Sequence, residues 1–290
     1  MLEIMATEPD LERLRLSIDE IDDEIHNLLL RRTDVVKQIG AVKRSHNTGR
    51  LPLRPSREAT IIRRLVTQHR GPFPINTLFH IWRELLSGQS IVQSQFSVAL
   101  CQDNMDSPGR NIVRDHFGGS IKLLPLTSPH QVVKAVSEDT APVGVLPVPS
   151  ETIEDPWWAI LARPSNTLVH VIARVPFLKQ KTDKSAHDDA LMIGKVPPEP
   201  SGDDISVLAV KLRKNVDRTQ IPRSRYMKDA KAKILATSLN RNQEDPEMHL
   251  VSIDGFVRQD EPVLRDLVVS EESPATEISV VGAYAKQLTV

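Results

Sequence analysis

The sequence contains a single cysteine, Cys101, among its 290 residues. An internal disulfide framework is therefore excluded, and the composition is typical of a reducing compartment. No apolar run approaches the roughly 20 residues that a membrane-spanning helix needs. The opening MLEIMATEPD has acidic residues where a signal peptide has basic and then apolar ones. We therefore expect a soluble, cytoplasmic protein with no membrane partner.

The chain also lacks a global charge of one sign, since 37 Lys and Arg stand against 38 Asp and Glu. Residues 11–96 are an exception, with 14 basic residues against 9 acidic ones. This local excess suits a small anionic ligand, and it equally suits a solvated helix face. A nucleic-acid module would need aromatic residues interleaved with the basic ones, which this region does not have. We expect no nucleic-acid partner.

Several chemical signatures are missing as well. The sequence has no cluster of metal-ligating residues, no glycine-rich phosphate loop and no nucleophile with a paired base. We therefore expect neither a metal nor another cofactor.

The strongest positive feature is an apolar stripe that steps alternately by three and four residues, which predicts a long packed helix. One member is an arginine, and a guanidinium keeps its charge at any ordinary pH. Burying it is costly unless an anion meets it there. The stripe consists of Leu11, Leu14, Ile18, Ile21, Ile25, Leu28, Arg32, Val35, Ile39 and Val42.

The organisation along the chain predicts several domains. A helix from about residue 10 to residue 44 is too long for a lone globular helix and favours a dimeric bundle. Two further helices, one ending before Gly71-Pro72 and one over residues 75–95, complete an all-helical domain over residues 1–96. Residues 97–179 predict a small α/β region, and the polar, proline-rich residues 180–203 predict a linker. Residues 204–290 predict a β-α-β-α-β module with a helix over 226–239.

Two cations of the first helix share one face. Arg32 and Lys43 are eleven residues apart, about 20° beyond three full turns. Arg15 points about 100° away from Arg32 on the same arithmetic. It could serve that pocket only from a second chain in an antiparallel dimer, or it could simply pair with Asp19 on the helix surface.

The other helices add polar residues. Arg57 and Glu58 open the second helix, where Glu58 suits the helix N-terminus and Arg57 could be a surface residue. Gln89 and Gln93 lie one turn apart on the third helix and face inward together. A buried glutamine needs partners, so they indicate either a core hydrogen-bond network or a polar ligand.

These residues resemble the all-helical chorismate mutases of the AroQ type over residues 11–95. The similarity lies in L-R-x-x-I-D-x-I-D around Arg15, R-R ending at Arg32, I-G-x-V-K ending at Lys43, P-x-R-P-x-R-E ending at Glu58, and Gln93. The resemblance implies an intertwined homodimer with shared active sites, no cofactor and chorismate as the substrate.

The same resemblance implies a role for each polar residue. Arg32 and a partner-chain Arg15 would hold the two carboxylates of chorismate, while Lys43 and Gln93 would donate to its ether oxygen. Glu58 would accept from the ring hydroxyl, and Arg57 would support the site. Gln89 stands where the family usually has a carboxylate-binding serine, and Pro55 stands near a position that is acidic in some members. We expect these two departures to alter affinity and not to abolish activity.

The rest of the chain resembles the tail of bifunctional chorismate mutase/prephenate dehydratase proteins. Asp115-His116-Phe117-Gly118 and Val143–Val148 are similar to the first dehydratase lobe, and residues 249–254 and 278–284 to an ACT domain. The dehydratase motif Thr-Arg-Phe is replaced by Thr167-Leu168-Val169, only twenty residues after Pro147, so most of a second lobe is missing. We expect no dehydratase activity.

Two hypotheses follow. The first is a cofactor-free chorismate mutase of phenylalanine and tyrosine biosynthesis. The alternative is a non-catalytic regulatory relative that binds an aromatic metabolite or a pathway enzyme. Joint retention of Arg15, Arg32, Lys43, Glu58 and Gln93 favours the first.

Overall fold

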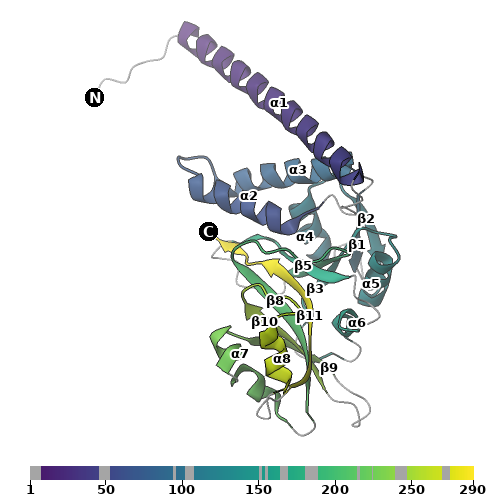
Figure 1. Cartoon of the computed structure of the whole chain (residues 1–290). Coiled ribbons are helices and arrows are strands. Elements are labelled where there is room, and N and C mark those ends of the chain that lie inside the picture. Colours follow the sequence, from purple (N-terminus) through teal and green to yellow (C-terminus); the bar gives the residue numbers. More distant parts are fainter. Residues whose placement is uncertain are drawn as a thin grey trace, which may run out of the picture.

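Three helices lead the chain in the computed structural model (Figure 1). The structure describes residues 8–45, 53–93, 96–101, 108–149, 152–153, 156–163, 169–179, 189–213, 216–223, 225–238, 247–269 and 275–290. Helix α1 covers Glu8–Ser45, α2 covers Pro55–Gln68 and α3 covers Ile75–Gln93. The three predicted helices are therefore confirmed. Thr167 and Leu168 lie outside the described residues.

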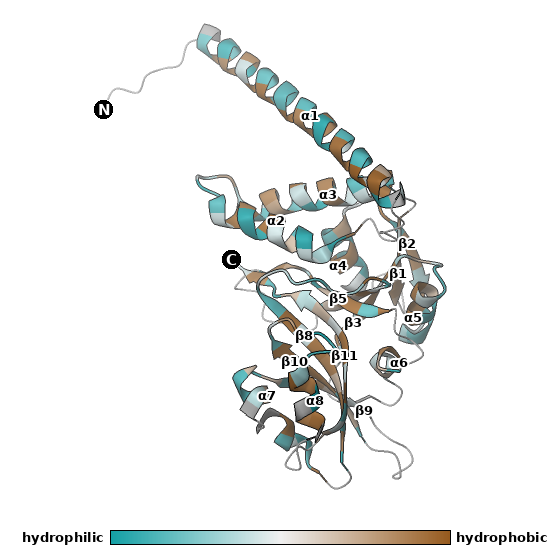
Figure 2. Cartoon of the chain, in the orientation of Figure 1, coloured by the Kyte–Doolittle hydropathy of each residue, from teal (hydrophilic) through white to brown (hydrophobic). Residues whose placement is uncertain are grey.

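Helix α1 extends well beyond the rest of the molecule, and only one end of it meets α3 (Figure 1). Its apolar stripe is visible as recurring brown segments along the projecting helix (Figure 2). The stripe is exposed in the single chain: Ile18 is 57% exposed, Leu28 57% and Val35 53%. The predicted packing of this stripe therefore does not occur within one chain.

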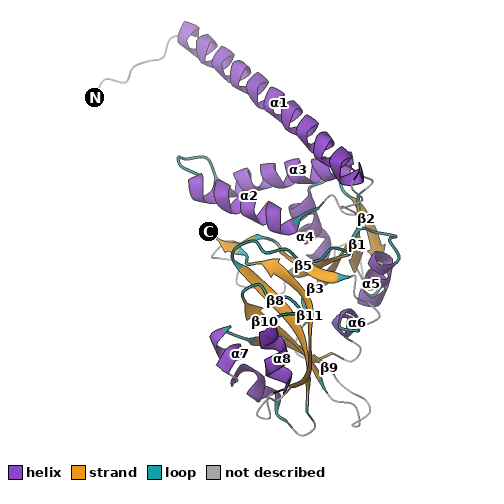
Figure 3. Cartoon of the chain, viewed as in Figure 1, coloured by secondary structure: helices purple, strands orange, loops and turns teal. Residues whose placement is uncertain are grey.

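Helices α2 and α3 pack on each other and on the α/β region below them (Figure 3). Their apolar cluster includes Ile62 and Phe79 from the helices and Phe177 and Ala285 from the α/β region. Arg63 of α2 secures the contact, because its guanidinium donates to the carbonyl oxygens of Ser201, Asp203 and Lys286. The helical hairpin thus shares a core with the α/β region.

A ten-stranded sheet forms the body, in the order β2-β1-β3-β7-β5-β11-β8-β10-β9-β4. The first part comprises β1 (Ser97–Cys101), β2 (Lys122–Leu126), β3 (Val143–Pro147), β5 (His170–Val175) and β7 (Ala190–Gly194). Helices α4 (Pro108–Phe117), α5 (Pro129–Ser137) and α6 (Trp157–Leu161) accompany it. Strands β1, β2 and β3 are parallel, and β7 runs antiparallel between β3 and β5.

The second part of the sheet comprises β8 (Asp204–Leu212), β9 (Lys233–Ser238), β10 (Met248–Asp254) and β11 (Ala275–Ala285). The 3-10 segment Arg218–Arg223 and helices α7 (Arg225–Asp229) and α8 (Pro262–Val269) belong to this part. The short β4 (Thr152–Ile153) pairs with the outer edge of β9. Strands β6 (Leu178–Lys179) and β12 (Leu288–Thr289) form a separate pair.

Two sequence predictions are corrected here. The helix expected over 226–239 is the short α7 followed by strand β9, because Ile234 and Ala236 pair with Val251 and Leu250 of β10 in the sheet. The linker expected over 180–203 contains β7, whose five residues are all buried between β3 and β5. Residues 180–188 lie outside the described part of the chain. The boundaries of the three predicted domains stay a prediction.

The two parts of the sheet meet where β11 pairs in parallel with β5. Gly282 of β11 is the residue in register with Val171, and a side chain there would overlap the Val171 backbone. A glycine is needed here because only a residue without a Cβ allows this close backbone approach.

We predict that Gly282→Ala lowers the free energy of unfolding by about 1–3 kcal/mol, since the strands must move apart to admit the methyl group. Denaturant unfolding measures the change. Gly119→Ala is the matched control, because a Cβ at Gly119 meets nothing within 4 Å. Equal stability of the two variants would contradict the tight approach of β5 and β11.

Candidate functional site

Arg32 and Lys43 of α1 both lie beside the N-terminal end of α2. Arg32 is half-buried, and burial lowers its pKa while the Glu58 carboxylate opposes that shift. Burial and then the nearby Arg54 guanidinium lower the pKa of Lys43, whereas Glu199 opposes them. The structure therefore brings both predicted cations to residues 54–58, as their shared helix face implied.

Arg32 has an unmatched donor. Its Nη1 atom is buried and has no hydrogen-bond partner among the described residues. A buried guanidinium nitrogen without an acceptor is costly, so the arrangement favours an anion at this point.

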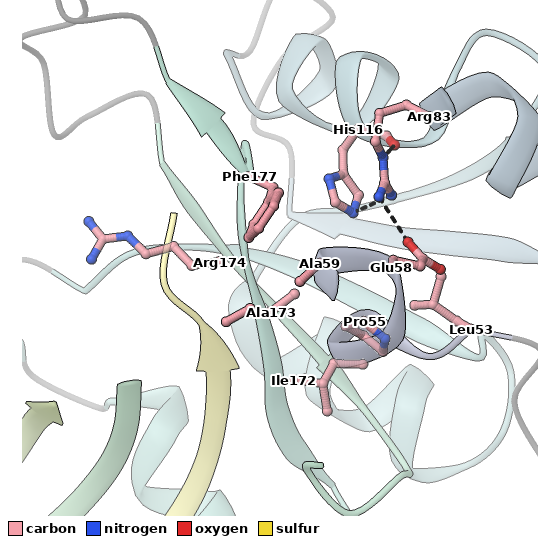
Figure 4. A pocket seen from close by; sticks show the side chains of 11 residues that line it. Leu53, Pro55, Glu58, Ala59, Arg83, His116, Ile172, Ala173, Arg174 and Phe177 are labelled. Atoms are coloured by element: carbon pink, nitrogen blue, oxygen red, sulfur yellow. Dashed lines mark hydrogen bonds and ion pairs between the residues drawn. The ribbon is translucent and has the colours of Figure 1, made fainter. Parts of the chain in front are cut away.

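Glu58 lies in the first turn of α2 and is 8% exposed. Its Oε2 atom accepts a hydrogen bond from Nη1 of Arg83 at 2.9 Å, and this contact is also a buried ion pair (Figure 4). Glu58 thus lies near Arg32, since its charge acts on that guanidinium. Its partner Arg83 is a residue that the sequence analysis missed.

Arg83 of α3 is 2% exposed and uses three donors. Besides the bond to Glu58, Nε donates to the carbonyl oxygen of His116 at 2.6 Å, and Nη2 donates to Nε2 of His116 at 2.8 Å. His116 is in the last turn of α4, where backbone carbonyls have no partner within the helix. Arg83 donates a hydrogen bond to one of these carbonyls. The next residue, Glu84, accepts from the Gly119 backbone at 3.0 Å.

The tautomer of His116 follows from this contact. Arginine is a donor only, so Nε2 of His116 must be the acceptor and the ring proton must sit on Nδ1. That Nδ1 atom is buried without a partner among the described residues. Burial and the Arg83 charge together hold the pKa of His116 well below its ordinary value, so the ring is neutral.

A small cavity adjoins these residues. Glu58, Arg83 and His116 line one side, and Ile172, Ala173 and Phe177 line the other (Figure 4). The Arg174 guanidinium points away from this group in Figure 4 and pairs with Asp189 at 2.6 Å. The cavity volume of about 20 Å³ is enough for one water molecule.

The two glutamines of α3 are placed differently from each other. Gln89 is 6% exposed, and its Nε2 donor has no partner among the described residues. Gln93 is half-buried at the last residue of the helix. Gln89 therefore has an amide donor available for a polar ligand inside the helical domain.

Arg57 and Arg15 are both exposed in the single chain. Arg57 lies next to Glu58 on α2, and Arg15 lies on α1, roughly 25 Å along the helix from Arg32. Arg15 does not reach the Arg32 site within one chain. For Arg15 this is the outcome that the helix geometry predicted.

A second stripe on α3 could have revealed Arg83. Phe79, Arg83, Leu86 and Ser90 recur at helical spacing, and all four are buried. Among the polar residues of this helix, only Gln89 and Gln93 were predicted from the sequence to face inward. A charged residue between Phe79 and Leu86 is the signal that the sequence analysis overlooked. No group of three or more metal-ligating residues occurs among the described residues.

The described helices also include none that is both long and apolar enough to cross a membrane.

The helical domain thus holds a buried, unmatched Arg32 donor close to Glu58, an arrangement that favours an anionic ligand. Residues 14–93 match the family model of chorismate mutase type II. This segment is therefore a chorismate mutase type II domain, which confirms the family expected for the first three helices.

Curated relatives share this region. The chain is 32% identical over 150 residues to the bifunctional chorismate mutase/prephenate dehydratase of Aquifex aeolicus, covering 50% of this chain and 40% of the relative. It is 25% identical over 151 residues to the protein of the same name from Pseudomonas aeruginosa, covering 51% and 41%. The chain thus spans about two fifths of the length of these relatives.

Solved structures are more distant. The prephenate dehydratase of Streptococcus mutans has a TM-score of 0.43 at 14% identity, covering 67% of this chain and all of that one. A structure described as GqqA, a novel type of quorum quenching acylase, has a TM-score of 0.47 at 11% identity, covering 67% of this chain and 96% of that one.

We predict that His116→Gln flattens the pH dependence of stability. Below about pH 6.5 the unfolded chain binds a proton at this residue that the folded chain refuses, so the free energy of unfolding falls as the pH falls. Between pH 6.5 and 5.5 this histidine accounts for about 1 kcal/mol of that fall.

Unfolding of both proteins in urea across this pH range measures the difference. His249, whose pKa is also lowered by burial, is present in both and cancels. Identical pH slopes would contradict the lowered pKa of His116, because they would mean that this residue takes up a proton equally readily in the folded and unfolded chains.

Proposed function

We propose that this protein is a chorismate mutase, which rearranges chorismate to prephenate in aromatic amino-acid biosynthesis. The observation that carries the proposal is the unmatched donor of Arg32 beside Glu58, in a domain of the chorismate mutase type II family. Chorismate is a dianion, and two cations on one helix face suit its charge. Arginine binds carboxylates bidentately, which fixes the orientation of the ligand as well as its position.

The proposed chemistry requires no acid, base or covalent intermediate. The rearrangement is unimolecular: the ether C–O bond breaks while a C–C bond forms between the two ends of the same molecule. An enzyme accelerates such a step by holding the folded conformer and by stabilising negative charge on the departing ether oxygen. In this proposal Arg32 performs the first task, and Lys43 and Gln93 donate to the ether oxygen.

The remaining polar residues complete the proposed site. Glu58 accepts from the ring hydroxyl, Gln89 donates its free amide to a carboxylate in place of serine, and Arg57 supports the α2 end of the site. The burial of Gln89 and Glu58 supports these roles, because each presents a polar group inside the helical domain.

We further propose a homodimer that buries the apolar stripe of α1. A stripe of ten positions in which Leu11, Ile18, Leu28 and Val35 are about half exposed is a large apolar surface for one chain. A second copy of the helix offers the same heptad spacing. An antiparallel arrangement would bring Arg15 of the partner chain to the Arg32 site.

A separate proposal concerns the activity of the α/β region. We infer that it does not dehydrate prephenate, since Thr167-Leu168-Val169 stands in place of the dehydratase motif.

We also propose that the protein is located in the cytoplasm, and its single cysteine supports this location.

We predict that Arg32→Ala reduces chorismate turnover by about a thousandfold or more while α1 stays helical, because the substrate loses a carboxylate partner that binds it and orients it. Loss of chorismate absorbance measures the rate, and far-ultraviolet circular dichroism measures the helicity. Lys37→Ala is the control, since Lys37 is exposed on the opposite side of α1 and pairs only with Asp34 at 3.7 Å.

The same assay tests the other proposals. The product of the wild-type protein should become phenylpyruvate only after acid is added; phenylpyruvate without acid would reveal dehydratase activity. Absence of wild-type turnover would favour the regulatory alternative. Normal turnover by Arg32→Ala would refute the assignment of the site.

We predict that inactive Arg15→Ala and inactive Arg32→Ala chains regain activity when they are mixed and allowed to exchange. Each mixed dimer would contain one site with both arginines intact, so up to about a quarter of the wild-type rate should return at equal mixing. Differently tagged chains verify that mixed dimers form. Verified mixed dimers without activity would show that the two arginines do not serve one shared site.

A further inference from the structure

Arg83 cannot be a substrate ligand in this structure. Its side chain is 3% exposed, and its three observed bonds engage Glu58 and His116. The effect of Arg83 on any ligand must therefore pass through Glu58.

Glu58 presents an electrostatic problem for a site that binds a dianion. Its carboxylate lies close enough to Arg32 to influence that guanidinium. An uncompensated carboxylate there would repel the ligand and would also compete for Arg32. In a partly buried site such a repulsion is stronger than in water, because the effective dielectric constant is lower.

The ion pair with Arg83 removes this problem. One positive and one negative charge 2.9 Å apart leave the pair neutral overall. Arg32 then keeps its buried Nη1 free, as the structure shows. The fixed geometry also turns one oxygen of Glu58 toward Arg83, so that the other can accept from a neutral donor.

The α/β region holds Arg83 in this position. His116 accepts from it twice, once through the carbonyl oxygen and once through the ring. Both acceptors are uncharged, so they orient the guanidinium without taking its charge from Glu58. The C-terminal end of α4 thus fixes the position of the Arg83 guanidinium.

We propose that Arg83 is a positioning residue for the mutase site: it neutralises and orients Glu58 so that Arg32 and Lys43 remain available to the dianion, and His116 of α4 holds it there. This inference rests on the proposed chorismate mutase activity. The α/β region is then part of the mutase, because helices α1, α2 and α3 alone lack the acceptors that fix Arg83.

The test compares three variants of the full chain. Arg83→Met removes the charge, and Glu58→Gln with Arg83→Met removes both charges. Arg163→Met is the matched control, because Arg163 is exposed and lies two residues after the end of α6. The measurements are kcat and KM for chorismate at about pH 7.5 and about pH 5.5.

We predict that Arg83→Met raises KM by about tenfold or more at the higher pH, since Glu58 then repels the dianion and attracts Arg32. The defect should shrink at the lower pH, because a larger fraction of any carboxyl group is protonated there and a neutral Glu58 does not repel the dianion. The double variant should have a lower KM than Arg83→Met at the higher pH, because no unpaired carboxylate is left to repel the dianion, even though this variant also lacks the carboxylate that accepts from the ring hydroxyl. Arg163→Met should match the wild type.

A purely structural role for Arg83 gives a different pattern. In that case the double variant would be as impaired as Arg83→Met, and the KM defect would not depend on pH; either result would overturn the proposal. If Arg83→Met fails to fold, Arg83→Lys replaces it, and a KM within twofold of the wild type at both pH values would support charge neutralisation. A tenfold higher KM for the lysine variant at both pH values would overturn it.

The outcomes separate this proposal from the proposed function. An inactive wild-type protein refutes the mutase activity and this inference with it. An active wild-type protein whose Arg83→Met variant behaves normally refutes the inference alone.

Discussion

The buried guanidinium of Arg83 connects the parts of this molecule. It joins Glu58 of α2 to the end of α4 from its place on α3, and all its observed contacts are short. A buried charge of this kind persists only when partners satisfy it, because the loss of one partner leaves an uncompensated ion. The positions of two helices and of the α/β region are therefore coupled through one side chain.

The α/β region is itself held together by a backbone contact. Strands β5 and β11 meet at Val171 and Gly282, and this pairing merges two groups of strands into one ten-stranded sheet. Helix α2 lies over this junction, where Arg63 binds the Ser201 and Asp203 carbonyls. The helical hairpin thus rests on the place where the two parts of the sheet join, so a shift between them would reach the site through α2.

In the single chain, helix α1 leaves an apolar stripe exposed and one buried arginine donor without a partner among the described residues. Its end beside α3 presents Arg32 and Lys43 to the site, while its apolar stripe remains exposed. In the proposed dimer, a second chain would bury the apolar stripe. In the proposed complex with substrate, an anion would accept a hydrogen bond from the free Arg32 donor.

The sequence alone determined the three helices, the shared face of Arg32 and Lys43, and the α/β character of residues 97–179 and 204–290, because helical periodicity and alternating apolar residues are local properties. It also determined the chorismate mutase resemblance, which residues 14–93 confirm. Tertiary structure decided what local patterns do not encode. It placed β7 inside the sheet although its flanks resemble a linker, made residues 233–238 a strand, and paired Glu58 with Arg83. Each of these depends on a contact between residues far apart in the chain, and only the folded chain determines which distant groups meet.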